Sequence, residues 1–182
     1  MDIFLVRHGE AAASWAESPD PGLSALGRQQ AETAAELLKP CAVHDTIVLS
    51  SPLQRAIETA APLASLLGQT VQINESFREI PSPVPLAQRQ TWLRQFMQQD
   101  WEEQSTELKK WRETAIEQLL SLKQPTVVFT HFLVINAVVG KLLDRPQTLC
   151  FRPCNGSITR IRLHGEGLEL MALGQQMESF VN

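Results

Sequence analysis

The chain opens with four consecutive apolar residues, Ile3 to Val6, that stop abruptly at Arg7-His8-Gly9. An uninterrupted apolar run of this length is typical of a strand buried on both faces of a parallel sheet, and the glycine favours a tight turn directly after it. Open α/β folds bind their ligands at the ends of such strands. Arg7 offers a planar fork for an anion such as phosphate, and His8 can act as a nucleophile or proton carrier near neutral pH. Taken alone, the pair could also simply cap a strand at the surface.

Two later apolar runs, at 46–49 and 126–130, end in a similar way. The first is followed by Ser51-Pro52, which predicts a strand-to-helix turn with the serine as N-cap and the proline at the first helical position. Arg55 would then lie in the first helical turn, where a positive charge is unfavourable unless an anion binds there. The second run ends at His131. Three strand ends therefore carry side chains able to contact phosphate.

Strand-like and helix-like segments alternate along the chain. Strands are expected at 2–6, 46–49, 71–73, 126–130, 157–163 and 168–173, and helices at 24–38 (capped by Ser24), 52–67 (ending at Gly68), 86–121 and 132–143. The last two strands are expected to form a hairpin. This alternation predicts an α/β fold, a three-layer αβα sandwich whose central sheet is mostly parallel with antiparallel strands at its edge.

The ordered set of motifs resembles the histidine phosphatase superfamily, the group that contains cofactor-dependent phosphoglycerate mutase and many phosphomonoesterases. The matching segments, in order along the chain, are 5–10, 23–31, 50–60, 77–80, His131 and 155–160. They span nearly the whole chain. Arg-His-Gly alone would be a weak signal, whereas the complete series in this order is specific.

The resemblance implies a role for each matching residue. His8 would attack the phosphorus and carry the phosphoryl group as phosphohistidine, while Arg7, Arg55 and His131 surround the transferring group. Glu79 would protonate the leaving alkoxide and then activate water. No metal ion or other cofactor is expected, because the arginines and histidines supply the positive charge.

Three features depart from the pattern of many relatives. Phe132 follows the second histidine where many relatives have glycine, and it could form an aromatic wall beside the phosphate. Ser14 stands where many relatives have asparagine, and its hydroxyl could contact phosphate. The glutamate leads into a proline-rich stretch, 81–85, with restricted backbone freedom. The catalytic set is therefore retained, while the residues expected to read the substrate differ.

The length of the chain fits one domain, residues 1–182, with a cap or insert segment at about 81–110. This segment lies between the expected acid and the second histidine and carries charges of both signs. We expect it to shield the site from water and to contact the non-reacting part of the substrate.

Composition limits the possible partners. The formal charge of −4 and the pI near 5.6 argue against a nucleic-acid partner, which requires a basic face. Neither a signal peptide nor an apolar run of about 18 residues is found, so a soluble, cytoplasmic protein without a membrane partner is expected. The three cysteines lack metal-site spacing and are expected to be free thiols. The oligomeric state is left open.

The favoured function is hydrolysis of a small phosphomonoester through a phosphohistidine intermediate. The alternatives are a phosphatase acting on phosphohistidine in a partner protein, a phosphoglycerate-type mutase, and a non-catalytic phosphate-binding domain. A pure binder has no use for a nucleophile and a separate acid, which favours an enzyme. The chain shows no long insert of the kind found in phosphoglycerate mutases, which favours hydrolysis over mutase activity.

Overall fold

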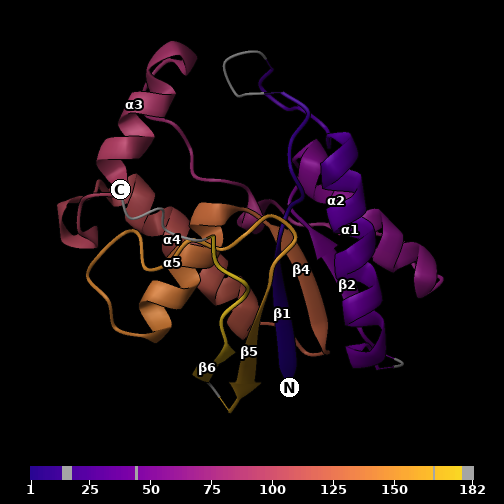
Figure 1. Ribbon diagram of the computed structural model, residues 1–182. Coiled ribbons are helices and arrows are strands. Elements are labelled where there is room, and N and C mark those ends of the chain that lie inside the picture. Colours follow the sequence, from indigo (N-terminus) through magenta and orange to yellow (C-terminus); the bar gives the residue numbers. More distant parts are fainter. Residues whose placement is uncertain (14–17, 44, 166, 178–182) are drawn as a thin grey trace.

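The computed structural model describes residues 1–13, 18–43, 45–165 and 167–177, and within these ranges the chain builds one six-stranded sheet (Figure 1). Its strands are β1 (Asp2–Arg7), β2 (Ile47–Ser50), β3 (Gln72–Ile73), β4 (Thr126–Thr130), β5 (Ile158–His164) and β6 (Gly167–Ala172). They lie in the order β3-β2-β4-β1-β5-β6. The first four along this order are parallel, and β5 and β6 add in antiparallel fashion at one edge.

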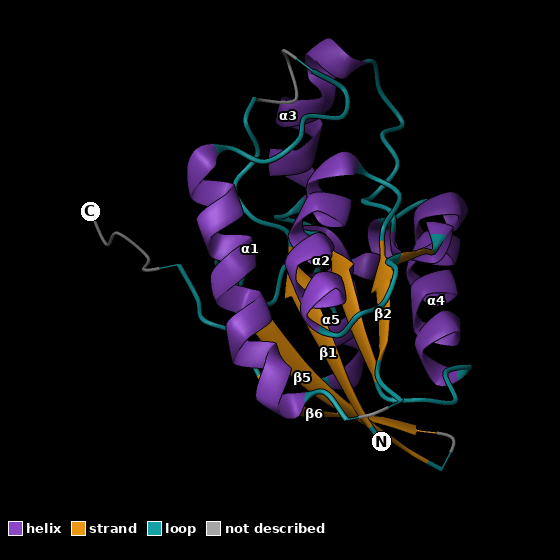
Figure 2. Ribbon diagram, turned by 90° about the vertical axis from the view of Figure 1, so that its right-hand side faces the viewer, coloured by secondary structure: helices purple, strands orange, loops and turns teal. Residues whose placement is uncertain are grey.

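Helices cover both faces of the sheet. They are α1 (Ala25–Leu38), α2 (Gln54–Leu66), α3 (Leu86–Phe96), α4 (Thr106–Leu120) and α5 (Phe132–Leu142), with short 3-10 turns at Lys39–Cys41, Glu75–Phe77 and Trp101–Glu103. Figures 1 and 2 show α1 and α2 on one side of the sheet and α4 and α5 on the other. The αβα sandwich with a mostly parallel sheet, expected from the sequence, is confirmed.

Alternation along β1 explains why both faces are covered. Phe4 and Val6 pack against α1 and α2, whereas Ile3 and Leu5 pack against α4 and α5. Successive side chains of a strand point to opposite faces, so a continuous apolar run needs a core on each side. All four side chains are at most 9% exposed. The apolar run at the start of the chain therefore fixes β1 in the middle of the sandwich.

Helix α2 begins later than the sequence predicts. It starts at Gln54, with Leu53 in the N-cap position, so the assignment of Ser51 as N-cap and Pro52 as first helical residue is wrong. The Ser51 hydroxyl instead contacts His131 Nε2 at 2.7 Å. A remote residue, Asp20, accepts the hydrogen bond from the Gln54 backbone N–H at 2.9 Å. The prediction of Ser24 as the cap of α1 is confirmed, because its side chain accepts from the Gly27 backbone.

The single helix expected over 86–121 is also wrong, since the chain forms α3, a 3-10 turn and α4 there. Two polar residues start the new elements. Asp100 and Glu103 form a capping box on the 3-10 turn, and the Ser105 side chain accepts from the Leu108 backbone at the start of α4. The break turns α3 away from the sheet, so that it lies beyond the carboxyl end of β1 (Figures 1 and 2).

Candidate active site

Three parallel strands end at the same edge of the sheet. Arg7, the last residue of β1, is in register with Thr130 of β4, and Ser50 of β2 is in register with Phe129. The residues that follow these ends are His8, Ser51 and His131. The sheet register thus brings together side chains that are far apart in the sequence, as expected for the carboxyl edge of an α/β fold.

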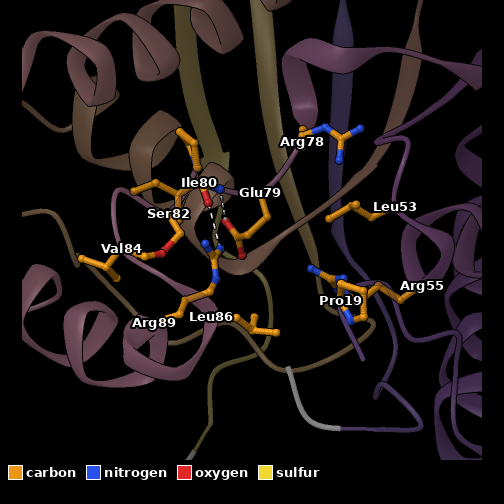
Figure 3. Close-up of a pocket in the computed structure, with 11 residues that line it drawn as sticks. Pro19, Leu53, Arg55, Arg78, Glu79, Ile80, Ser82, Val84, Leu86 and Arg89 are labelled. Carbon is orange, nitrogen blue, oxygen red and sulfur yellow. Dashed lines mark hydrogen bonds between the residues drawn. The ribbon is translucent and has the colours of Figure 1, made fainter. Parts of the chain in front are cut away.

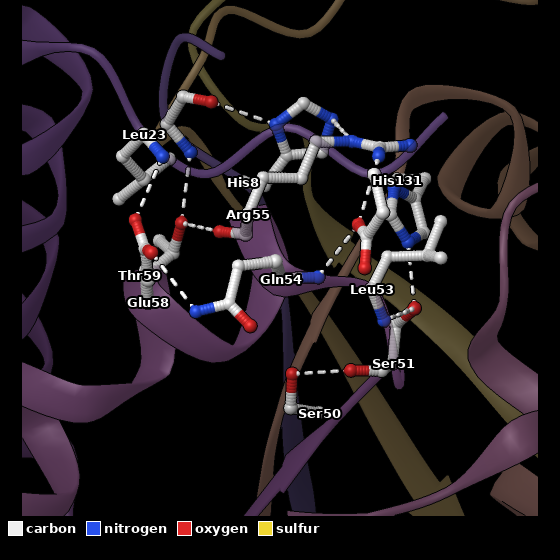
Figure 4. A network of polar contacts seen from close by, with 12 residues as sticks. His8, Leu23, Ser50, Ser51, Leu53, Gln54, Arg55, Glu58, Thr59 and His131 are labelled. Carbon is white, nitrogen blue, oxygen red and sulfur yellow. Dashed lines mark hydrogen bonds and ion pairs between the residues drawn. The ribbon is translucent and has the colours of Figure 1, made fainter. Parts of the chain in front are cut away.

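His8 is buried and its two ring nitrogens have different partners (Figure 4). Nδ1 lies 2.7 Å from the carbonyl oxygen of Gly9, which can only accept, so Nδ1 carries the proton. Nε2 accepts a hydrogen bond from Nε of Arg55 at 3.2 Å. Burial, followed by the nearby charge of Arg55, lowers the pKa of His8 to about 3. The imidazole is therefore neutral near pH 7, with its lone pair on Nε2.

His131 packs beside His8, with 5.1 Å between the two ring centroids. It is fully buried at the N-terminus of α5, and burial holds its pKa well below the usual range. Ser51 Oγ, which also accepts from the Leu53 backbone, lies 2.7 Å from Nε2 of His131. Nδ1 of His131 is buried and has no hydrogen-bond partner among the described residues. If the Ser51 hydroxyl donates to Nε2, the proton of the imidazole sits on Nδ1 as a donor in need of a partner.

Arg7 is held from two sides. Its Nη1 donates to the carbonyl oxygen of Pro153 at 2.7 Å, and its guanidinium lies 5.1 Å from the ring centroid of Phe132. Burial lowers the pKa of Arg7 to about 10, which leaves it charged near neutral pH. Nε of Arg7 is a second buried donor without a partner among the described residues. A bound oxyanion would offset the cost of desolvating such donors.

The segment 153–157 fixes the backbone on which Arg7 and His8 sit. The Gly156 N–H donates to the Arg7 carbonyl oxygen, and the Asn155 side chain donates to the His8 carbonyl oxygen at 3.0 Å. Gly156 has a φ of +71°, which favours glycine. The sequence motif at 155–160 thus supports the backbone of Arg7 and His8, a role that the pattern alone did not indicate.

Arg55 enters the site from the first turn of α2 and is only 1% exposed. Its Nη1 lies 3.9 Å from a carboxylate oxygen of Asp20. The next turn of the same helix reaches back to the segment after β1, because Thr59 Oγ1 accepts from the Gly9 N–H at 3.0 Å (Figure 4). Helix α2 therefore holds both Arg55 and the segment that follows His8.

Glu79 is buried, and it lies close enough to Arg55 for the two charges to interact. Backbone N–H groups of Ile80 and Leu133 donate to its carboxyl group. Burial raises the pKa of Glu79 above its usual value, although these hydrogen bonds and the charges of Arg55 and Arg89 oppose the rise. The net direction favours the protonated carboxyl group, which can act as an acid.

Glu79 and Arg55 line a cavity of about 340 Å³ (Figure 3). The other residues that line it are Pro19, Leu53, Arg78, Ile80, Pro81, Ser82, Val84, Leu86 and Arg89. His8 is not among the residues that line this cavity, but it is hydrogen-bonded to Arg55, which is. The cavity has the size of a small-metabolite site, since ligand pockets start at roughly 300 Å³.

The structure brings together His8, Arg7, Arg55, Glu79 and His131, and places Phe132 against Arg7. Ser14, expected to contact phosphate, lies outside the described residues. Three further residues lie at this site: Ser51, which the sequence predicted only as a helix cap, and Asp20 and Arg89, for which it predicted no role. For Asp20, the signal in the sequence was the Asp-Pro-Gly stretch at 20–22, which is typical of a turn. In the described part of the chain, no group of three or more His, Cys, Asp or Glu could hold a metal ion.

The fold and the site define a class of protein. It is an α/β protein in which neutral histidines and charged arginines form a buried cluster that can bind an oxyanion. The family model of the histidine phosphatase superfamily (branch 1) matches residues 3–176, so the chain belongs to this family. The resemblance expected from the sequence is confirmed.

Individual relatives match more narrowly. Glucosyl-3-phosphoglycerate phosphatase of Mycolicibacterium vanbaalenii is 37% identical over 81 residues, 42% of this chain and 35% of the relative. The curated relatives that it matches are covered over only 14–41% of their own length. Two solved structures share the fold: phosphoserine phosphatase from Entamoeba histolytica in complex with 3-phosphoglyceric acid, and a putative alpha-ribazole-5'-P phosphatase from Escherichia coli. Each is 24% identical to this chain, with a TM-score of 0.74. Each match covers 96% of this chain and 97% of the other chain.

No helix in the described ranges is long and apolar enough to cross a membrane.

Proposed function

We propose that this protein hydrolyses small phosphomonoesters and that His8 accepts the phosphoryl group. The observation that carries the proposal is the state of the His8 ring. Its Nδ1–H is tied to the Gly9 carbonyl oxygen, and its unprotonated Nε2 faces Arg55. A neutral imidazole with a fixed lone pair next to a guanidinium is what a nucleophile for a phosphate ester requires.

The arginines and His131 bind the phosphoryl group in this proposal. Arg7 and Arg55 supply charged N–H donors. In the tautomer in which the Ser51 hydroxyl donates to Nε2, His131 supplies a further donor at Nδ1. Phosphoryl transfer passes through a loose transition state with negative charge on the equatorial oxygens, so positioned cationic donors stabilise it directly. Phe132 keeps the Arg7 guanidinium in place through its ring, and the Ser14 hydroxyl is proposed as an added phosphate contact.

In the first half-reaction, Nε2 of His8 forms a bond to phosphorus while the bond from phosphorus to the ester oxygen breaks. Glu79 transfers its proton to that oxygen, and the alcohol leaves. Burial keeps the proton on Glu79 before the transfer, because it raises the pKa of the carboxyl group. The products of this step are the alcohol, ionised Glu79 and phosphohistidine.

In the second half-reaction, the ionised Glu79 removes a proton from water as the water oxygen bonds to phosphorus. The bond from phosphorus to Nε2 breaks, releasing inorganic phosphate and restoring neutral His8 and protonated Glu79. One carboxyl group therefore serves as acid and then as base, which balances the protons over the cycle.

The segment at about 81–110 is proposed as a cap within a single domain. Its loop and the start of α3 supply Ser82, Val84, Leu86 and Arg89 to the cavity wall. A cavity of about 340 Å³ accommodates a small substrate. The presence of an acid at the cavity favours hydrolysis over simple phosphate binding.

The test is trapping of the intermediate. The protein is incubated with p-nitrophenyl phosphate, quenched, and examined for phosphoprotein that is labile to acid and stable to alkali. We expect wild type to form it, His8→Ala to lose both phosphoprotein and turnover, and His164→Ala, a change in an exposed histidine, to retain both. Turnover by His8→Ala at the wild-type rate would overturn the proposal.

A further inference from the structure

Two buried polar atoms on neighbouring strands have no hydrogen-bond partner among the described residues. They are Nε of Arg7, at the end of β1, and Oγ of Ser157, the residue directly before β5. Ser157 is only 7% exposed, and the mechanism proposed above gives it no role. A buried polar group without a partner costs free energy, so both atoms call for an explanation.

A tight turn places Ser157 opposite Arg7. The Ser157 N–H donates to the Cys154 carbonyl oxygen at 3.1 Å, which closes a turn of four residues. Its third residue, Gly156, has the positive φ of +71° that a type II turn requires. Directly after this turn, the Arg7 N–H donates to the Ser157 carbonyl oxygen at 3.1 Å. The two residues are therefore paired across β1 and the start of β5.

The side chains of Arg7 and Ser157 point to the same face of the sheet. Ile158 and its partner in β1, Val6, both pack on the side of α1 and α2. Because successive side chains of a strand alternate, Ser157 and Arg7 point to the opposite side, which α5 covers. The contact between the Arg7 guanidinium and Phe132, the first residue of α5, agrees with this placement. Side chains directly opposite each other on one face of an antiparallel pair are close enough to interact.

The two unpartnered atoms have complementary chemistry. A guanidinium N–H can only donate, and a serine hydroxyl can accept. Arg7 is already held at Nη1 by the Pro153 carbonyl oxygen. A second hydrogen bond at Nε would fix the plane of the guanidinium at two of its three nitrogens, and Nη2 would remain to bind a phosphate oxygen.

We propose that Ser157 is a positioning residue for the reaction: its hydroxyl accepts a hydrogen bond from Nε of Arg7 and so holds the guanidinium in the orientation that binds phosphate. The inference rests on the proposed phosphatase function. Rotation of the Ser157 side chain between staggered positions forms the bond, since the two atoms are not bonded to each other in the structure. The alternative is that Nε of Arg7 itself contacts phosphate and that Ser157 has a purely structural role.

The experiment is a double-mutant cycle in which kcat/KM is measured with p-nitrophenyl phosphate. Ser157→Ala in the wild-type background should lower kcat/KM about tenfold, the scale of a hydrogen bond to a charged group. Arg7→Lys has no N–H at the Nε position. Adding Ser157→Ala to Arg7→Lys should therefore cost less than about twofold, whereas a purely structural role predicts the same loss in both backgrounds.

Three further variants separate positioning from stability. Ser157→Thr keeps the hydroxyl and should retain most of the activity. Thr159→Val removes another hydroxyl on the same face, one that accepts from the Gly174 N–H at 3.1 Å, and should lower stability in urea while leaving kcat/KM unchanged. Should Ser157→Ala fail to fold, the cycle is run with Ser157→Cys, because a thiol is only a weak acceptor.

Inorganic phosphate provides a second readout. Its inhibition constant should rise in Ser157→Ala by about the same factor as kcat/KM falls, because the Arg7 contact to phosphate is weakened in both cases. A purely structural role would leave the inhibition constant of the folded variant unchanged.

Two results would overturn the inference while leaving the phosphatase proposal standing. One is wild-type kcat/KM in Ser157→Ala, and the other is an equal loss from Ser157→Ala in the wild-type and Arg7→Lys backgrounds. If wild type releases no phosphate from p-nitrophenyl phosphate, both the proposed function and this inference are wrong.

Discussion

Nε of Arg55 donates a hydrogen bond to Nε2 of His8 at 3.2 Å, so the nitrogen proposed as nucleophile is held by the cation proposed to bind phosphate. The contact settles which His8 nitrogen carries the lone pair, because a guanidinium can only donate. It also implies an exchange. In the proposed mechanism, Arg55 turns Nε from Nε2 of His8 toward a phosphate oxygen when the ester binds, and this frees the lone pair for attack.

Arg55→Lys tests this double role. Lysine keeps the charge but lacks the planar fork, so it cannot hold the phosphate oxygens in bidentate fashion. We expect kcat/KM with p-nitrophenyl phosphate to fall by roughly 10²–10³-fold, the scale for loss of one preorganised donor at a transition state. Arg145→Lys, an exposed change, serves as control. A loss below about threefold in Arg55→Lys would show that the fork is dispensable.

Glu79→Gln tests the acid. Alkyl phosphates have a poor leaving group and should lose roughly 10²–10⁴ in rate, the range typical of general acid–base catalysis. Nitrophenolate leaves without a proton, so the burst of p-nitrophenol from p-nitrophenyl phosphate in rapid-quench experiments should suffer far less. Glu36→Gln, an exposed change on α1, should affect neither. Equal losses in the burst with both leaving groups would rule out Glu79 as the acid.

The buried histidines should make the fold sensitive to acid. The pKa of His8 is lowered from its ordinary value of 6.5, which the unfolded chain retains, to about 3 in the folded protein. Between these two values the unfolded chain binds more protons than the folded one, so the stabilisation is fully present above pH 6.5 and is lost as pH falls toward 3. By about pH 5 His8 alone should cost ~2 kcal/mol of unfolding free energy.

Urea unfolding of wild type and His8→Ala at several pH values measures this contribution. The variant should lose less stability than wild type between about pH 7 and about pH 5, by an amount on the order of the His8 cost. Parallel curves for His8→Ala and wild type would contradict a depressed pKa of His8.

Activity should not depend on a divalent metal. Arg7 and Arg55 already place positive charge at the proposed phosphate position, the task that a metal ion performs in other phosphoryl-transfer enzymes. Treatment with EDTA, followed by assay with p-nitrophenyl phosphate, should leave kcat and KM at their untreated values. A rate that EDTA abolishes and that magnesium or zinc restores would count against the mechanism.

The sequence predicted the parts of this protein that follow local patterns. The apolar run before Arg7 and the runs before Ser50 and His131 predicted parallel strands, and the shared edge of those strands follows from the fold class. The family motifs selected His8 and Glu79 as members of one site, and the structure brings them together around Arg55. Their catalytic roles stay predictions.

Other features depend on contacts that no local pattern contains. Ser51 reads as a helix cap, yet its hydroxyl is directed to His131, 80 positions away. The sequence places Arg89 among the mixed charges of the cap segment but does not predict its burial, because that burial depends on how the break after Phe96 orients α3. The capping of α2 by Asp20 likewise requires the segment after β1 to fold back across the helix end.

Asp20 yields a prediction that separates stability from binding. Its carboxylate accepts from the Gln54 N–H, a cap that Leu53 cannot supply, and it lies 3.9 Å from Nη1 of Arg55. Asp20→Ala removes both interactions and should lower the unfolding free energy by about 1 kcal/mol, the usual cost of losing an N-cap. Asp20→Asn keeps an accepting oxygen and should recover most of that loss in urea unfolding.

The charge beside Arg55 is absent in both variants, so both should bind inorganic phosphate more tightly than wild type does. The reason is that the Asp20 carboxylate competes electrostatically with a phosphate oxygen for the same guanidinium. Inhibition of p-nitrophenyl phosphate hydrolysis by inorganic phosphate measures this, and the inhibition constant should fall in Asp20→Asn despite its near wild-type stability. An unchanged inhibition constant in Asp20→Asn would mean that Asp20 acts only as a helix cap, and that the Arg55 charge reaches phosphate unopposed in the wild-type protein.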